Sequence, residues 1–144
     1  MAPSTLLPRR RTGTTISVTI GGERFDLTTN ADETGALLEV LVRWGKAGST
    51  TAGLMELYAI ALSVALQHGV PLGELVRQGL NLGFAPCGRT DDPDIPYARS
   101  VIDWVSRRLA LDWLPRKEQA ALGITAGRTC NVRVPAPRRA VERS

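Results

Sequence analysis

Cysteine is nearly absent from the sequence. The 144-residue chain has two cysteines, Cys87 and Cys130, and neither belongs to a Cys-x-x-Cys pair. A disulfide framework needs several paired cysteines, and a structural zinc site needs about four ligands. A dithiol relay needs two neighbouring thiols. The sequence therefore argues against all three.

Histidine is rarer still, with the single residue His68. The candidate cysteine–histidine catalytic pair is Cys87 with His68, but no base lies near Cys87 in the sequence. His68 follows an apolar run, and we expect it at a helix C-terminus, where partial positive charge is favourable. We therefore predict no catalytic residues in this chain.

Long apolar segments are also missing. The most apolar run, residues 57–66, is shorter than the roughly 20 residues that span a bilayer. The N-terminus lacks the apolar core of a signal peptide, because Leu6 and Leu7 are followed at once by Pro8 and three arginines. We expect a cytoplasmic protein with no membrane partner.

Positive charge is concentrated at the two ends of the chain. The net charge is +4, with +3 in residues 1–13 and +4 in residues 127–144, which leaves −3 for residues 14–126. We predict a basic arm, a single domain and a basic tail with these boundaries. The arms either bind nucleotide or nucleic acid, or are solvated termini. Their candidate binding residues are Arg9, Arg10, Arg11, Arg138 and Arg139.

Short segments rich in β-branched residues predict an N-terminal sheet. Residues 14–20 and 23–29 alternate between apolar and polar side chains, and Gly21 and Gly22 between them are typical of a two-residue hairpin turn. Residues 37–44 offer a third strand with apolar positions on one face. Three strands with one apolar face need a covering layer.

The covering layer is predicted to be a helix over residues 50–68, with Ser49 as its N-cap and Gly69 as the left-handed residue that follows it. Apart from a narrow stripe formed by Ser49, Glu56 and Ser63, nearly all its positions are apolar. A helix that is apolar around most of its circumference is buried by several neighbours. We expect it to be the buried central helix of the domain, although a dimerisation helix has the same pattern.

Two further helices are predicted downstream. One covers residues 71–83, and the other covers residues 97–114, with Asp94 as N-cap and Pro115 at its end. Positions four apart on the polar side of the second helix can form ion pairs: Arg99, Asp103 and Arg107. The predicted fold class is α+β, with a small antiparallel sheet of about three N-terminal strands packed against the buried central helix and these two helices.

Three carboxylates, Asp91, Asp92 and Asp94, lie close together in the loop before the second of these helices. Closely spaced carboxylates are ligands for Mg²⁺ or Ca²⁺, but the EF-hand spacing with its distal glutamate is missing. Pro93 stiffens the turn, and Asp94 is a ready helix cap. We therefore predict no metal site.

Arg107 and Arg108 are the most prominent basic pair between the two tails. They either bind the phosphate of a nucleotide or form a salt-linked helix face with neighbouring aspartates. No glycine-rich phosphate loop accompanies them in the sequence. The candidate residues for binding a nucleotide or a partner are Arg89, Asp91, Asp92, Arg107 and Arg108.

The same stretch carries a family resemblance. Phe84, Pro86 and Gly88 precede Thr-Asp-Asp-Pro-Asp at residues 90–94, and Arg-Arg-Leu-Ala-Leu-Asp follows at residues 107–112. This pattern resembles the C-terminal accessory region, the TSCPD-type domain, of the adenosylcobalamin-dependent (class II) ribonucleotide reductases. The resemblance covers most of the chain. The Thr-Ser-Cys-Pro-Asp signature and the cysteine-rich tail of that family are absent from this sequence.

The resemblance implies an accessory or regulatory domain of a ribonucleoside-diphosphate reductase, associated with deoxyribonucleotide synthesis for DNA replication and repair. It implies a separate catalytic chain as partner and adenosylcobalamin as the cofactor of that chain, with no cofactor in this one. The family's catalytic barrel is absent, so the chain is not expected to be a complete enzyme. Two alternatives stay open: a nucleotide- or nucleic-acid-binding module that uses the arginine tails, and a homo-oligomeric interaction domain.

Overall fold

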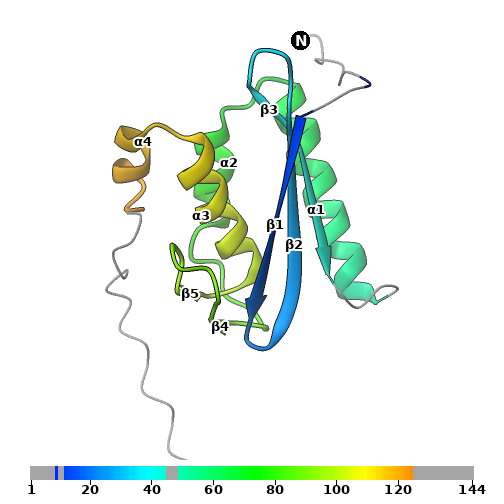
Figure 1. The fold of residues 1–144 in the computed structure, drawn as a ribbon, viewed down its shortest axis with the longest axis vertical. Helices are drawn as coiled ribbons and strands as arrows, with labels where there is room; N and C mark the ends of the chain where they lie inside the picture. The colour runs from blue at the N-terminus through cyan, green and yellow to red at the C-terminus, as the bar shows by residue number, and fades with distance from the viewer. Residues whose placement is uncertain (1–8, 10–11, 45–48, 125–144) are drawn as a thin grey trace, which may run out of the picture.

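The computed structural model describes residues 9, 12–44 and 49–124. These residues form a three-stranded antiparallel sheet, two helices, a two-stranded ribbon and two further helices, in that order along the chain. The α+β class is thereby confirmed. Figure 1 shows the long sheet in the middle, with α1 beside β3 and with α2 and α3 on the other side.

The hairpin β1–β2 is built by its glycine turn. β1 (Thr12–Ile20) pairs with β2 (Glu23–Ala31), and Gly21 and Gly22 adopt φ angles of +55° and +85°. Positive φ at both central residues matches the twist of the hairpin and favours glycine. The predicted turn and pairing are confirmed, and each strand is two residues longer than expected because the ladder continues past the alternating segment.

β3 (Leu37–Trp44) has the predicted bounds and completes the sheet order β1-β2-β3. Its pairing with β2 shifts register between Asn30 and Ala31. One face of the sheet is apolar and buried, and its strand residues form one core cluster with α3 side chains. The buried apolar residues of these three strands are Val18, Ile20, Phe25, Leu27, Leu37, Leu38, Val40 and Val42.

α1 (Thr50–Gln67) covers the open edge of β3. Ser49 caps the helix by accepting from the Ala52 N–H, and Gly69 is left-handed, as predicted. The backbone N–H and C=O of Val40 point away from β2, and the Ser63 hydroxyl accepts from the first at 2.9 Å and lies 3.0 Å from the second. Edge strands need such partners, since exposed ladders pair with other chains.

The expected burial of α1 on most sides is corrected by the structure. Four residues of the helix are buried: Met55, Ala59, Leu62 and Ser63. The sheet ends at β3, and no other described element lies over the outer side of α1. By length and composition α1 could also cross a membrane, but core helices of soluble proteins meet the same criterion. Of the 18 residues of α1, 28% are buried.

The second half of the chain contains α2 (Leu72–Gly79), β4 (Gly88–Arg89), β5 (Tyr97–Ala98), α3 (Val101–Trp113) and α4 (Arg116–Ala121). The predicted start of α3 is wrong. Ser100, not Asp94, caps this helix, and its hydroxyl accepts from the Asp103 N–H at 3.1 Å. Tyr97 and Ala98 are extended instead, because they pair with β4.

Candidate functional site

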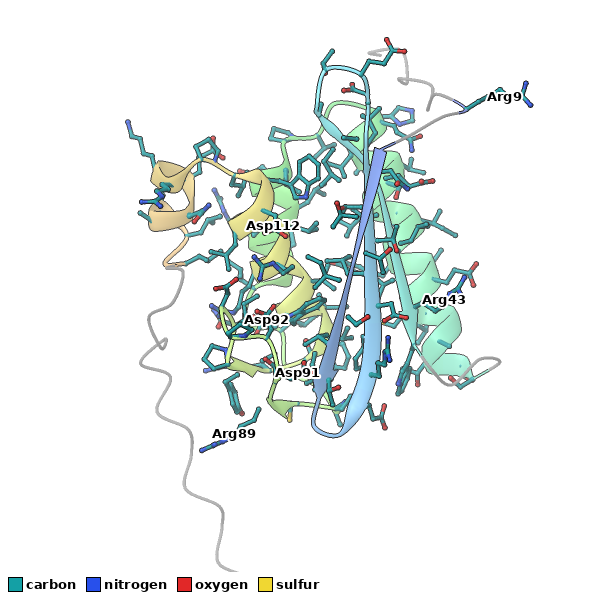
Figure 2. The ribbon with its side chains drawn as sticks, viewed as in Figure 1. Arg9, Arg43, Arg89, Asp91, Asp92 and Asp112 are labelled. Carbon is teal, nitrogen blue, oxygen red and sulfur yellow. The ribbon has the colours of Figure 1, made fainter. Side chains whose placement is uncertain are left out.

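The loop between α2 and α3 is docked on the free edge of β1. The Asp91 N–H donates to the Thr19 carbonyl at 3.3 Å, and an Asp91 carboxylate oxygen accepts from the Thr19 N–H at 2.8 Å. The Gly21 N–H donates to the Arg89 carbonyl at 3.3 Å. Figure 2 shows Asp91 near the β1–β2 turn, with the Arg89 side chain directed outward. Asp91 therefore covers the second edge of the sheet at the end of β1, beside Thr19.

Asp92 points the opposite way, into the interior, where 8% of the residue is exposed. Its carboxylate accepts from the indole N–H of Trp104 at 3.0 Å and from the Asp94 N–H at 3.0 Å. Arg108 Nη1 lies 3.2 and 3.3 Å from the two carboxylate oxygens. A buried carboxylate is tolerated when its oxygens are satisfied in this way.

Arg108 joins three aspartates into one network. Besides Asp92, its Nη1 contacts Asp94 at 3.0 Å, and its Nε and Nη2 contact Asp112 at 3.0 and 2.6 Å. Burial by itself would lower the pKa of Arg108, but the hydrogen bonds to Asp112, Asp94 and Asp92 raise it above its usual value. The guanidinium is thus permanently charged, and its donors are directed to the chain's own carboxylates.

A second network surrounds Asp103, which is 1% exposed. Its carboxylate accepts from Arg107 Nε at 3.0 Å, from the Asn81 N–H at 2.7 Å and from the Arg99 N–H at 2.9 Å. Arg107 Nη2 also donates to the Asn81 side chain at 2.9 Å. The predicted Asp103–Arg107 pair is confirmed, whereas Arg99 contributes its backbone N–H. Asp103 ties the start of α3 to the end of α2.

In both networks an arginine of α3 pairs with an aspartate and so connects parts of the fold: Arg108 with Asp92, and Arg107 with Asp103. Of the five candidate residues, Asp92 and Arg108 contact each other directly. Arg107 belongs to the Asp103 network, and Arg89 and Asp91 lie at the β1 edge. Binding of a nucleotide or partner by these residues stays a prediction. Among described residues, no three His, Cys, Asp or Glu side chains are placed to hold a metal ion.

Cys87 and His68 occupy opposite ends of the sheet. The Cys87 carbonyl lies against Gly21 in the β1–β2 turn, and Cys87 is exposed. His68 follows α1 near the other end of the sheet, where the neighbouring Gln67 donates to the Leu38 carbonyl. The Nδ1 of His68 lies 2.8 Å from the Val64 carbonyl. The two residues therefore do not form a catalytic pair.

The two arms fall largely outside the described residues. Arg9 is described and exposed. The other candidate arm residues, Arg10, Arg11, Arg138 and Arg139, lie outside the described residues. The proposal that these arginines bind phosphate stays a prediction.

Sequence reasoning missed several residues that take part in the Asp92 and Asp103 networks or lie beside them. Trp104 donates to Asp92, and the Asn81 N–H donates to Asp103. Ser100 donates its hydroxyl to the Leu82 carbonyl. One local signal was present, because Trp104 and Arg108 are four residues apart and so share a helix face. Their common partner Asp92 lies across a loop, and helical periodicity does not report on it.

The sequence matches the TSCPD domain family over residues 2–112. It is 48% identical over 118 residues, 82% of this chain, to the vitamin B12-dependent ribonucleotide reductase of Streptomyces avermitilis, where the match covers 12% of the chain. The reductase of the same name from Streptantibioticus cattleyicolor is 48% identical, with 20% of its chain covered. The one from Agrobacterium fabrum is 37% identical over 115 residues, which are 79% of this chain and 9% of the relative.

The chain therefore spans between 9 and 20% of the length of these relatives. No solved structure matches it. The similarity concerns a domain within a longer protein.

Proposed function

The chain belongs to the TSCPD domain family, and we propose on this basis that it serves as an accessory or regulatory domain of a vitamin B12-dependent ribonucleotide reductase. In this role it associates with a catalytic chain that makes deoxyribonucleotides. It is not a complete catalyst by itself. The family's cofactor, adenosylcobalamin, belongs to the catalytic chain.

One observation carries the proposal. The matched segment is 82% of this chain and 12% of the reductase of Streptomyces avermitilis, at 48% identity. The most economical role is therefore the one that the segment has in the longer relatives, in company with the rest of the reductase.

The polar groups of the domain support an accessory role. Asp92, Asp103 and Arg108 bind other groups of the same domain. No cobalamin site is assigned to this chain. Among the described residues no three His, Cys, Asp or Glu side chains are placed to hold a metal ion, and the one histidine of the sequence, His68, is exposed at the end of α1. No step of the chemistry is assigned to this chain.

Binding in trans tests the proposal. The Streptomyces avermitilis reductase would be prepared without its matched 118-residue segment and titrated with this chain by isothermal calorimetry. We expect saturable binding to the truncated reductase and weaker binding to the intact reductase, whose own segment already occupies the site. Absence of binding to the truncated reductase, when it is folded, would contradict the proposal.

A further inference from the structure

The outer side of α1 carries an apolar surface that no described residue covers. We define the α1 stripe as Leu54, Leu57, Ile60, Ala61 and Val64, all of which are exposed. Leu57, 61% exposed, is the most exposed large apolar residue in the part of the chain that the structure describes. Leu41 of β3, the strand next to α1, is also exposed. Large apolar patches on a protein surface mark sites of interaction.

The stripe has the spacing of a helix–helix seam. Leu54, Leu57, Ala61 and Val64 are separated by three, four and three residues, which are the a and d positions of a heptad. The opposite side of α1 is already used, since Ser63 and Gln67 bind the β3 edge. A second helix therefore has one face of α1 available to it.

Charge does not oppose the approach of an identical helix. Glu56 is the one charged residue within α1. The helix has no acidic residue in its first turn and no basic residue in its last turn. The partial charges of its ends are thus not balanced by ionised side chains of the helix itself. An antiparallel neighbour compensates them, because it places each N-terminus beside a C-terminus.

We propose that the α1 stripe is the interface of a homodimer in which α1 of one copy packs antiparallel against α1 of a second copy. A two-fold interface must be self-complementary. When the two-fold axis passes at the level of Ala59 along the helix, antiparallel packing sets Leu57 of each copy against Ala61 of the other, and Leu54 against Val64. Large side chains meet smaller ones in both halves of the interface. This inference does not depend on the association with a reductase.

Sedimentation equilibrium of the full chain tests the dimer. The wild-type chain is expected to sediment at twice its 15.5 kDa mass. Leu57→Glu should reduce the mass to that of one chain while the circular dichroism spectrum is unchanged, because Leu57 faces solvent in the monomer. Leu82→Glu is the matched control, since Leu82 is 46% exposed but lies outside α1, and it should remain dimeric.

Disulfide trapping tests the orientation and keeps the proposal falsifiable if Leu57→Glu misfolds. In a Cys87→Ser and Cys130→Ser background, chains with Leu54→Cys are mixed with chains with Val64→Cys and oxidised. Antiparallel packing predicts the mixed disulfide. A monomeric wild-type chain, a folded Leu57→Glu dimer, a Leu54→Cys self-disulfide without the mixed one, or Leu57-dependent binding to phosphatidylcholine vesicles in place of dimerisation would each overturn it.

Discussion

Trp104 donates its indole N–H to the carboxylate of Asp92 over 3.0 Å, and this bond fixes the acidic loop to α3 in the protein interior. Arg108, one turn further along α3, binds the same carboxylate. The loop in turn bonds the end of β1 through Asp91. The acidic loop therefore connects the sheet to the helical layer.

Asp92→Ala is expected to lower the free energy of unfolding by about 1–3 kcal/mol, because it leaves the buried Trp104 indole N–H without its acceptor and removes one of the three carboxylates that pair with Arg108. Asp112→Ala is the matched control. Asp112 also pairs with Arg108, but its side chain is partly exposed, so its loss should cost at most about 1 kcal/mol. Urea unfolding of both variants measures the difference. Equal losses of unfolding free energy in the two variants would show that Asp92 contributes no more to stability than the partly exposed Asp112.

Gly79→Ala should destabilise the contact between α2 and α3. A Cβ at Gly79 would overlap Ser106 Oγ and would lie 3.0 Å from Ile102 Cγ2. Overpacking of this kind costs about 1–3 kcal/mol. Gly73→Ala, in the same helix, would meet only Glu118 at 3.5 Å and should stabilise by up to about 1 kcal/mol through helix propensity. Thermal melting of the two variants should shift in opposite directions, and a shared direction would contradict the packing.

Ser63→Ala is expected to cost about 1–3 kcal/mol, since it leaves the Val40 N–H without its acceptor at a buried strand edge. Ser17→Ala is the control. Ser17 bonds Asp26 on the exposed face of the sheet, where water replaces the lost group, and its effect should stay within about 0.5 kcal/mol. Hydrogen exchange at Val40 should accelerate in the first variant alone; equal protection in both variants would argue against the α1–β3 bond.

Alkaline pH should destabilise the fold through Tyr58. Burial raises the pKa of Tyr58 from its ordinary value of 10.0. Above the unfolded pKa of about 10 the unfolded chain loses this proton while the folded chain keeps it. The contribution is therefore complete below pH 10.0 and is lost as the pH rises through the folded pKa. Tyr58→Phe should show a smaller decline in unfolding free energy, and an identical decline would refute the assignment.

Local requirements explain which parts of the fold could be predicted. Positive φ at Gly21 and Gly22 needs glycine, so the hairpin leaves a direct mark in the sequence. The bounds of β3 and the Ser49 cap follow from equally local rules. The Asp103–Arg107 pair is also local, because it spans one helical turn.

The remaining features depend on contacts that local patterns do not encode. Asp94 and Ser100 both suit a helix start, and the pairing of Tyr97 and Ala98 with β4 decides for Ser100. A helix buried within its own chain and a helix that presents one face to another molecule can both be apolar around most of their circumference. The sequence pattern therefore could not predict that Leu57 is exposed. The Asp92–Trp104 bond joins a loop to a helix and has no periodicity.

Ribonucleotide reduction in trans is the most direct test of the central claim that this chain works with a catalytic chain and not alone. The assay compares this chain, the truncated Streptomyces avermitilis reductase and their mixture, each with adenosylcobalamin and a dithiol. We predict no deoxyribonucleotide from this chain alone and a saturable change in the rate of the truncated reductase when the chain is added. Product formed in proportion to this chain alone, or a rate indifferent to its addition, would contradict the account.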